Sequence, residues 1–305
     1  MAVVKKSVEK SDQFLEVQLA GGIGNQLFQY CGLLATANTL NRPPQLIEQG
    51  PHDHKKMHGN SIAKLSVPIP IRRRSFANSR LLSVCWRIDR WIIARNKGYS
   101  QFRRVYQFDN AASKTTSTDL DKFNELRGYF QSWDYVKPYV SHIRDLLRQS
   151  DRKPLLDFAS RLETSTVMAL HARRGDYKSN VQEQGLLSLE YYLAASKQLL
   201  KRSSFDEIWI FSDDQDFSEK IANYLAPLIN QTVVVDQGTL EASEVIDLMS
   251  RCAGQVISNS TFSWWAAALA NDPERVIAPY PWSRNEKENS QIYDSKWGME
   301  ASIWE

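Results

Sequence analysis

The stretch Val-Met-Ala-Leu-His-Ala-Arg-Arg-Gly-Asp-Tyr at residues 167–177 changes abruptly from apolar to charged. Its first five residues have the length and apolar character of a buried strand. Two adjacent arginines, a glycine and an aspartate then follow where that strand would end. Because α/β sheets bind ligands at the carboxyl ends of their parallel strands, this stretch predicts both a parallel sheet and a binding site at its edge.

The sequence that follows this stretch alternates between strand and helix patterns. Short apolar runs are separated by segments in which apolar residues recur at helical spacing. Alternation of this kind is typical of a parallel sheet that helices cover on both faces. We predict strands at 207–212, 233–236, 256–259 and 276–279, and helices at 189–200, 215–225, 241–252 and 262–271.

A second unit of strand, glycine turn and helix opens the N-terminal half. Residues 14–20 alternate like a strand, the turn Gly-Gly-Ile-Gly-Asn follows at 21–25, and apolar residues then recur at helical spacing as far as Ala37. Glycines let a ligand approach the backbone closely, and the N-terminus of the following helix would favour an anion. An ordinary strand-to-helix turn explains the same glycines equally well.

The rest of the N-terminal half is less regular. Residues 41–60 indicate a loop, residues 62–71 a strand, and the basic, aromatic segment 71–104 a helical surface element. A short strand at 128–133 leads to a helix at 135–149. The predicted organisation is a flexible leader at 1–13, one α/β domain at 14–150 and a second at 151–305.

Composition excludes several classes of protein. The 305 residues are 42% hydrophobic and 24% charged, as in folded globular proteins, and this length favours two domains. A formal net charge of +3 is too small to indicate nucleic-acid binding. The three cysteines are widely spaced, which argues against a disulfide framework or a zinc site and favours a reducing compartment.

Membrane insertion is not expected from the sequence. The apolar run at 81–94 contains three charged residues, and the N-terminus has no apolar core of the kind found in secretory signals. We therefore expect a cytoplasmic protein, with at most peripheral membrane association through the basic segment 72–104. No oligomeric state follows from the sequence.

The two arginines of the first motif allow different roles. Arginine presents a rigid fork of donors that matches phosphate oxygens. We predict that Arg173 binds the ligand, whereas Arg174 could form an ion pair with Asp176 that holds the loop. A histidine beside two arginines at a strand end is poorly explained as core, so His171 also belongs to the predicted site.

Two further polar motifs follow predicted strands. Phe-Ser-Asp-Asp-Gln-Asp at 211–216 could bind a divalent metal. Capping of the next helix by Ser212, Asp213 or Asp214 explains the acids without a metal, and we expect none. Ser-Asn-Ser-Thr-Phe-Ser-Trp-Trp at 258–265 places small polar residues where they could cap a helix or bind a pyrophosphate. Capping accounts for one of these residues and not for all.

Taken together, the motifs at 21–30, 171–177, 211–214 and 258–265 resemble those of the α-1,2-fucosyltransferases, glycosyltransferase family 11, in both identity and order. The resemblance covers residues 14–281. It implies a GT-B-like α/β architecture of two facing Rossmann-like domains, with the donor GDP-β-L-fucose bound by the C-terminal domain. The implied reaction inverts the anomeric centre and transfers fucose to the 2-hydroxyl of a terminal galactose in a glycan. It needs no metal or other cofactor.

The resemblance also implies roles for individual residues. Arg173 matches the residue that grips the donor diphosphate, and His171 and Arg174 complete its motif. An acid shortly before Leu-Met-Ser-x-Cys at 248–252 would pair with guanine, and either Glu244 or Asp247 could be that acid. The other donor-binding residues implied by the match are Gly22, Gly24, Asn25, Gln26, Asn259, Ser260, Thr261 and Ser263.

Transfer of fucose builds negative charge on the departing phosphate, and preorganised cations stabilise that charge in the transition state. A carboxylate can accept the proton of the acceptor hydroxyl. Asp176 is the first candidate for this base and Glu183 is the second, although Asp176 could also serve only to lock the arginine loop.

Two alternatives stay open at this point. One is a fucosyltransferase with another linkage or acceptor, for example one that O-fucosylates proteins. The other is a GDP-sugar-binding module without catalysis, which the full set of motifs makes the weaker interpretation. Release of GDP with and without acceptor separates a binding protein from an enzyme.

Overall fold

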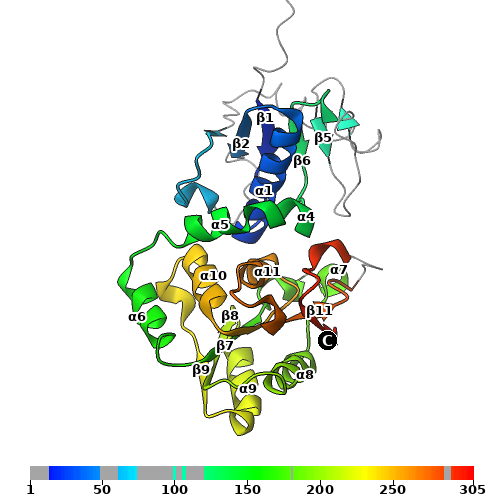
Figure 1. Ribbon diagram of the computed structural model, residues 1–305. Helices are drawn as coiled ribbons and strands as arrows, with labels where there is room; N and C mark the ends of the chain where they lie inside the picture. The colour runs from blue at the N-terminus through cyan, green and yellow to red at the C-terminus, as the bar shows by residue number, and fades with distance from the viewer. Residues whose placement is uncertain are drawn as a thin grey trace, which may run out of the picture. The chain divides into compact units, whose positions relative to one another are not determined.

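The structure is a computed structural model that describes residues 14–48, 61–73, 99–100, 105–107, 120–179, 181–284 and 290–305. The predicted leader at 1–13 lies outside this described part. The chain divides into two compact units, Met1–Tyr139 and Val140–Glu305. Each unit consists of a largely parallel sheet with helices packed against it, which confirms the predicted α/β class with two Rossmann-like halves (Figure 1).

The first unit is built around one long helix and a mixed sheet. Its elements are β1 Leu15–Gln18, α1 Ile23–Leu40, β2 Pro44–Glu48, η3 Ile62–Lys64, β3 Ile71–Arg73, β4 Tyr99–Ser100, β5 Val105–Gln107, β6 Glu125–Arg127, α4 Trp133–Val136 and η4 Lys137–Tyr139. The described strands lie in the order β3-β2-β1-β6-β5-β4 and are parallel except for β4 with β5. Helix α1 packs against β1 and β2 through an apolar face that includes Leu27 and Phe28.

The second unit follows the regular alternation expected from the sequence. Its elements are α5 Val140–Leu147, α6 Lys153–Arg161, β7 Val167–Ala172, η5 Asp176–Ser179, α7 Val181–Gln184, α8 Leu189–Leu200, β8 Glu207–Ser212, α9 Gln215–Leu225, η6 Ala226–Leu228, β9 Gln231–Val234, η7 Gln237–Thr239, α10 Ala242–Arg251, β10 Gly254–Val256, α11 Thr261–Ala268, η8 Pro273–Arg275, β11 Val276–Tyr280, η9 Ser290–Ile292 and β12 Gly298–Ala301.

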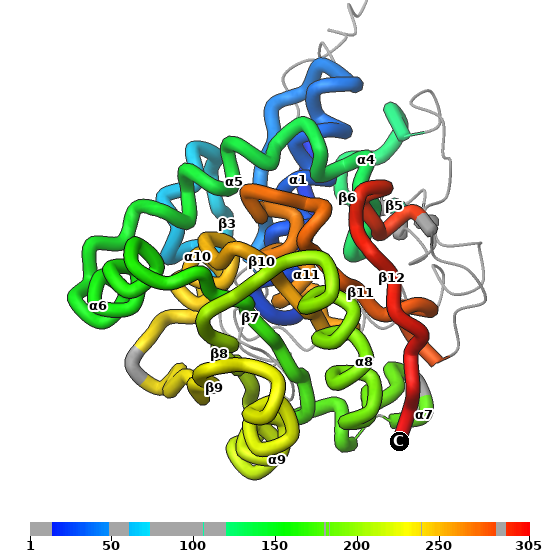
Figure 2. The backbone as a smooth tube through the Cα atoms, turned by 60° about the horizontal axis from the view of Figure 1, so that its bottom comes forward, coloured from blue at the N-terminus to red at the C-terminus, as the bar shows by residue number. Residues whose placement is uncertain are grey.

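The strands of the second unit form a sheet whose described neighbours are all parallel, in the order β12-β11-β10-β7-β8-β9. Counted from β7, this is the doubly wound order of dinucleotide-binding folds. Helices α8 and α9 cover one face, while α10 and α11 lie on the other (Figures 1 and 2). The core is apolar because strand residues such as Met168 and Ile208 pack against helix residues such as Leu199 and Ile221.

In both sheets the strand order reverses beside the first strand. The reversal lies between β1 and β6 in the first unit and between β7 and β10 in the second. Connections leave such a point in opposite directions, so backbone groups at the carboxyl edge there are free to meet a ligand. The glycine turn follows β1 and the arginine motif follows β7, so both motifs stand at a reversal point.

The structure differs from the sequence prediction in several places. Strand β2 lies inside the predicted loop 41–60, because the buried Leu46 and Ile47 continue the sheet beside β1. The segment 71–104 begins with β3 rather than a helix, and 74–98 lies outside the described residues. The units part after Tyr139, earlier than the predicted 150, because α5 packs on α10 of the second unit.

Two further expectations concern cysteines and membrane spans. Cys31 and Cys252 are buried free thiols, as expected, while Cys85 lies outside the described residues. Among the helices that the structure describes, none has the combined length and apolar character that a bilayer span requires.

Candidate functional site

The arginine loop, residues 173–176, leaves the buried strand β7 at the reversal point of the second sheet. Its backbone is held by Asp213, which follows the neighbouring strand β8. The Asp213 Oδ1 atom accepts hydrogen bonds from the backbone N–H of Arg174 at 2.8 Å and of Gly175 at 3.0 Å. Glycine at 175 leaves room for the Asp213 carboxylate, which a Cβ atom there would force to shift.

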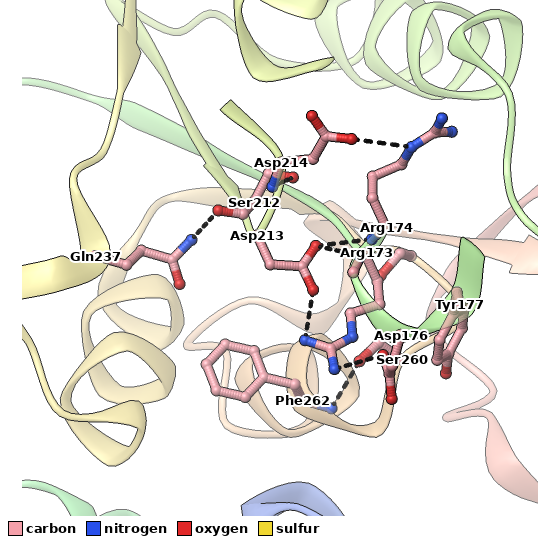
Figure 3. A network of polar contacts seen from close by, with 12 residues as sticks. Arg173, Arg174, Asp176, Tyr177, Ser212, Asp213, Asp214, Gln237, Ser260 and Phe262 are labelled. Carbon is pink, nitrogen blue, oxygen red and sulfur yellow. Dashed lines mark hydrogen bonds and ion pairs between the residues drawn. The ribbon is translucent and has the colours of Figure 1, made fainter. Parts of the chain in front are cut away.

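The Arg173 guanidinium lies between two carboxylates (Figure 3). Its Nη1 is 2.7 Å from Asp213 Oδ2, and its Nη2 donates to Asp176 Oδ1 at 2.7 Å. The Arg173 side chain is 24% exposed, so solvent or a ligand can reach it. A guanidinium carries five N–H donors, and these two contacts leave several of them for a ligand.

Arg174 has a different environment and is buried. Its guanidinium binds Glu305 through two contacts, of 2.6 Å and 3.1 Å, and lies 4.0 Å from the centre of the Phe217 ring. Its Nε is 3.7 Å from Asp214. The predicted ion pair between Arg174 and Asp176 is therefore not formed, since Asp176 pairs with Arg173. Arg174 instead connects the loop to Glu305.

The two acids directly after β8 have different partners. Asp213 binds the arginine loop, whereas Asp214 caps the next helix. Asp214 is the N-cap of α9, accepting from the backbone N–H of Phe217 at 3.2 Å. A hydrogen bond from Lys178 lowers the pKa of Asp214. Asp213 does not cap the helix and was not among the predicted site residues. Within the described ranges, no three His, Cys, Asp or Glu side chains converge as a metal site would require.

His171 is buried beneath the loop. Its Nδ1 lies 2.9 Å from Ser258 Oγ, which in turn lies 3.3 Å from Ser263 Oγ. Burial lowers the pKa of His171 to about 3, and the positive charge of Arg173 acts in the same direction. The imidazole is therefore neutral at physiological pH. His171 and Ser263 form a buried polar chain that joins β7 to the segment after β10.

The segment 258–261 lies across the reversal point from the arginine loop. Ser260 is the N-cap of α11, accepting from Phe262 N–H at 3.3 Å, and Thr261 begins the helix. Asn259 is buried, and its Oδ1 has no hydrogen-bond partner among the described residues. Its backbone oxygen accepts from the Tyr177 hydroxyl at 3.0 Å, which ties this segment to the arginine motif.

Glu244 and Asp247 lie on α10 and are both buried. Glu244 completes the capping box of that helix and accepts from Arg152 at 2.7 Å. Asp247 accepts from Arg251 at 2.5 Å and 3.1 Å. Both carboxylates already accept from arginine, and the choice between them as the guanine-binding acid stays a prediction. Glu183 lies in α7, and its side chain is outside the described residues.

The glycine turn of the first unit is held by amides. Gly21 has a φ of 75°, a left-handed conformation that glycine adopts without strain. Gly22 is the N-cap of α1, and Gly24 is buried in its first turn. The buried Gln26 donates from Nε2 to the Gly21 oxygen at 2.9 Å and accepts from the Ile62 N–H at 3.0 Å, so it braces the turn.

Asn25 is paired across the reversal point of the first sheet. Its Oδ1 accepts from Gln131 Nε2 at 3.0 Å. Gln131 follows Phe130, a non-glycine residue with a φ of 54°. Backbone strain of this kind is found at functional sites more often than elsewhere. Sequence analysis missed Gln131, which stands in the short segment after β6 and has no motif of its own.

Known proteins resemble this chain over most of its length. A model of glycosyl transferase family 11 matches residues 1–301. The chain is 28% identical over 282 residues to an alpha-1,2-colitosyltransferase of Escherichia coli, covering 90% of this chain and 93% of that protein. It is 26% identical over 270 residues to a galactoside 2-alpha-L-fucosyltransferase of Caenorhabditis elegans, covering 84% and 68%.

Among solved structures, the chain resembles NodZ alpha-1,6-fucosyltransferase co-crystallised with GDP. The TM-score is 0.50 at 14% sequence identity, over 85% of this chain and 93% of that one. A likeness at this identity concerns the fold alone.

Proposed function

The chain belongs to glycosyl transferase family 11, and we propose that it transfers L-fucose from GDP-β-L-fucose to the 2-hydroxyl of a terminal galactose with inversion at the anomeric carbon. One observation carries the proposal. The Arg173 guanidinium is accessible, held in place and equipped with spare donors at the reversal point of a doubly wound sheet. The names of the two curated relatives support a 1,2 linkage.

The donor diphosphate would lie over the carboxyl ends of β7 and β10. Arg173 follows the first of these strands, and the N-terminus of α11 follows the second. A helix N-terminus presents unpaired N–H groups and a partial positive charge, which favours phosphate. Thr261 is the residue that brings this helix end to the edge, and its partly exposed side chain adds a hydroxyl there.

Residues at this edge of the sheet could supply both the cation and the base that fucosyl transfer requires. The acceptor oxygen bonds to C1 of fucose while the bond from C1 to the β-phosphate oxygen breaks, and that electron pair leaves with GDP. Arg173 stabilises the negative charge that grows on the phosphate. The acceptor proton passes to the Asp176 carboxylate, which is 56% exposed. A diphosphate that competes for Arg173 would free Asp176 for this task.

The proposal includes metal independence. The cation that stabilises the leaving diphosphate is supplied by Arg173 and the end of α11, while the two acids after β8 are bound to arginine, lysine and backbone groups. Turnover should therefore persist in excess EDTA. Loss of turnover that manganese restores would replace this mechanism with a metal-assisted one.

The decisive experiment measures GDP release from GDP-fucose with lactose, lacto-N-biose, N-acetyllactosamine and Gal-β-1,3-GalNAc as acceptors. NMR of the product then gives the linkage. We expect acceptor-dependent release and an α-1,2 product with at least one of them. Another linkage would correct the acceptor position, and binding of GDP-fucose without turnover on any acceptor would favour a non-catalytic module.

A second donor is favoured by one specific observation, the colitosyltransferase name of a relative at 28% identity. Colitose is the 3-deoxy analogue of fucose. A site that hydrogen-bonds the 3-hydroxyl discriminates strongly against an analogue that lacks it. Competition between GDP-fucose and GDP-colitose, with turnover measured for each, therefore decides which sugar the site is built to hold.

A further inference from the structure

The proposed chemistry leaves one charged side chain of the site without a role. Asp213 directly follows Ser212, which pairs with Ala172 at the end of the adjacent strand β7. This register places the carboxylate beside Arg173 at the carboxyl edge of the sheet. Asp213 is not a helix cap, and no three metal-ligating side chains converge in the described ranges.

The two oxygens of Asp213 have separate partners. Oδ1 is fixed by two backbone N–H groups, those of Arg174 and Gly175. Oδ2 is 2.7 Å from Nη1 of Arg173. Because Oδ1 is held by the backbone, the position of Oδ2 is set by the fold rather than by side-chain motion. The carboxylate therefore provides a rigid support against which the guanidinium rests.

Asp176, the second carboxylate that pairs with Arg173, is in a more exposed environment. Asp176 is 56% exposed against 30% for Asp213, and it belongs to the same loop as the arginine it contacts. An exposed ion pair of this kind contributes little fixed geometry, since water competes for both partners. Of the two acids, Asp213 is thus the one that can determine where the guanidinium points.

We propose that Asp213 is a positioning residue, which aims Arg173 at the β-phosphate of the nucleotide. The inference rests on the proposed function and adds to it the reason why an acid stands beside a diphosphate site. A fixed guanidinium loses less conformational entropy on binding phosphate than a free one. That gain has to exceed the repulsion between the Asp213 charge and the diphosphate.

These two effects have opposite signs, which makes the inference testable by binding alone. If Asp213 were only a nearby negative charge, its neutralisation would tighten GDP binding. If it positions Arg173, the same change weakens GDP binding. Asp213→Asn is suited to the test, because the amide oxygen can keep both backbone hydrogen bonds while the amide nitrogen no longer attracts the guanidinium.

The experiment measures the Kd of GDP by calorimetry for the full chain and its variants, together with their melting temperatures. We expect Asp213→Asn to weaken GDP binding about tenfold, the order of one charge-assisted contact, at a nearly unchanged melting temperature. In an Arg173→Ala background the same substitution should weaken binding no further and should tighten it slightly, because only the charge is then removed.

Gly175→Ala provides an independent variant. The new methyl group would overlap the Asp213 carboxylate and force it away from Arg173, and residue 175 has no positive φ that would strain an alanine. Gly175→Ala should therefore weaken GDP binding as Asp213→Asn does. Asp216→Asn, an exposed acid in the first turn of α9, is the matched control and should leave Kd unchanged.

Unchanged or tighter GDP binding by Asp213→Asn would overturn the inference while leaving the proposed function in place. Equal weakening in the presence and absence of Arg173 would overturn it as well, because Asp213 would then act on the nucleotide or the fold directly. If the unmodified chain binds no GDP, the proposed function fails and the inference fails with it.

Discussion

The two loops at the reversal points of the two sheets are built from opposite chemistries. The turn after β1 is braced by neutral amides, with Gln26 on the Gly21 oxygen and Gln131 on Asn25. The loop after β7 is braced by ionised groups, with Arg173 between two aspartates and Arg174 on Glu305. Both loops follow the first strand of a largely parallel sheet at the point where its strand order reverses, so this position alone does not explain the difference.

The difference indicates what each loop is suited to hold. A polyanion such as a diphosphate requires fixed cations, and cations held at a buried edge require carboxylates to support them. A neutral glycan presents hydroxyl groups, which amides bind by donating and accepting without an electrostatic cost. The comparison supports our proposal that the nucleotide binds the second unit. The expectation from sequence that the glycine turn binds the donor anion stays a prediction.

The largest expected effect comes from Arg173. Replacement by lysine keeps the positive charge but removes the fork that two carboxylates and a phosphate share. We expect turnover to fall by about a hundredfold or more for both Arg173→Lys and Arg173→Ala, which corresponds to about 3 kcal/mol of transition-state stabilisation. The melting temperature should change little, because the side chain is accessible and its partners lie at the surface of the site.

Arg275→Lys is the control for this prediction, because Arg275 forms an exposed pair with Asp272 away from the arginine loop. Its turnover should match that of the unmodified chain. Near-normal turnover of Arg173→Lys would remove Arg173 from the mechanism. Lost turnover with an equally collapsed melting temperature would mean that the arginine is structural.

Replacement of the neighbouring Arg174 should, in contrast, lower the stability of the fold. Arg174→Met keeps an unbranched apolar side chain at this buried position, but it removes the guanidinium from the Phe217 ring and leaves Glu305 without its cation. We expect a loss of about 2 kcal/mol in the free energy of unfolding, measured with denaturant. Stability unchanged in this variant would show that the Glu305 pair contributes nothing. Glu305→Gln should lose less, because the glutamate is the more exposed partner.

Much of the fold was predictable because the sheet of the second unit is buried on both faces. The predicted boundaries of α8, β8 and α9 are confirmed, since each is a clean apolar or amphipathic run between polar turns. Strands β2 and β12 were missed. They are strands because of the neighbours that they pair with, β1 and β11, which the local sequence does not reveal.

The sequence predicted those parts of the site that depend on neighbouring residues in the chain, and it missed contacts between distant residues. The sequence placed Arg173 directly after a strand, and β7 ends at Ala172. It also placed Ser260 at a strand end, whereas β10 ends earlier, at Val256, and Ser260 is the N-cap of α11. It could not reveal that Arg174 pairs with Glu305, because 131 residues separate them. It named Asp213 as one of three candidate helix caps because capping is a local rule, whereas the observed partners of Asp213 lie in the loop that follows the neighbouring strand β7.

The buried His171 of β7 should also make stability sensitive to acid. The pKa of His171 is about 3 in the folded state and about 6.5 in an unfolded chain, so between these values the unfolded state binds one more proton. Stability is then complete above pH 6.5 and is lost as pH falls towards 3. Between pH 7 and 5 the contribution of this one group is about 2 kcal/mol.

The measurement compares His171→Gln with the unmodified chain by denaturant unfolding at pH 7 and pH 5. The variant has lost packing around Ser258, so its absolute stability is lower and only the difference between the two pH values is informative. We expect a smaller loss on acidification in the variant. Equal losses in both proteins would mean that His171 does not titrate as its burial predicts.

The smallest effect is expected in the glycine turn, and it decides what that turn binds. Asn25→Asp preserves the oxygen that accepts from Gln131 but replaces an amide donor by a negative charge. If the turn binds a neutral acceptor, as its amides suggest, the KM for the acceptor should rise about tenfold through the lost donor, while the Kd of GDP stays within about twofold. If the turn instead holds the donor anion, as its glycines and helix end first indicated, the added charge should weaken GDP binding and leave the acceptor KM unchanged. Asn38→Asp on the exposed side of the same helix is the matched control and should alter neither constant. A rise in the GDP constant alone would therefore contradict the contrast between a neutral and a charged loop, because the glycine turn would then bind the donor anion.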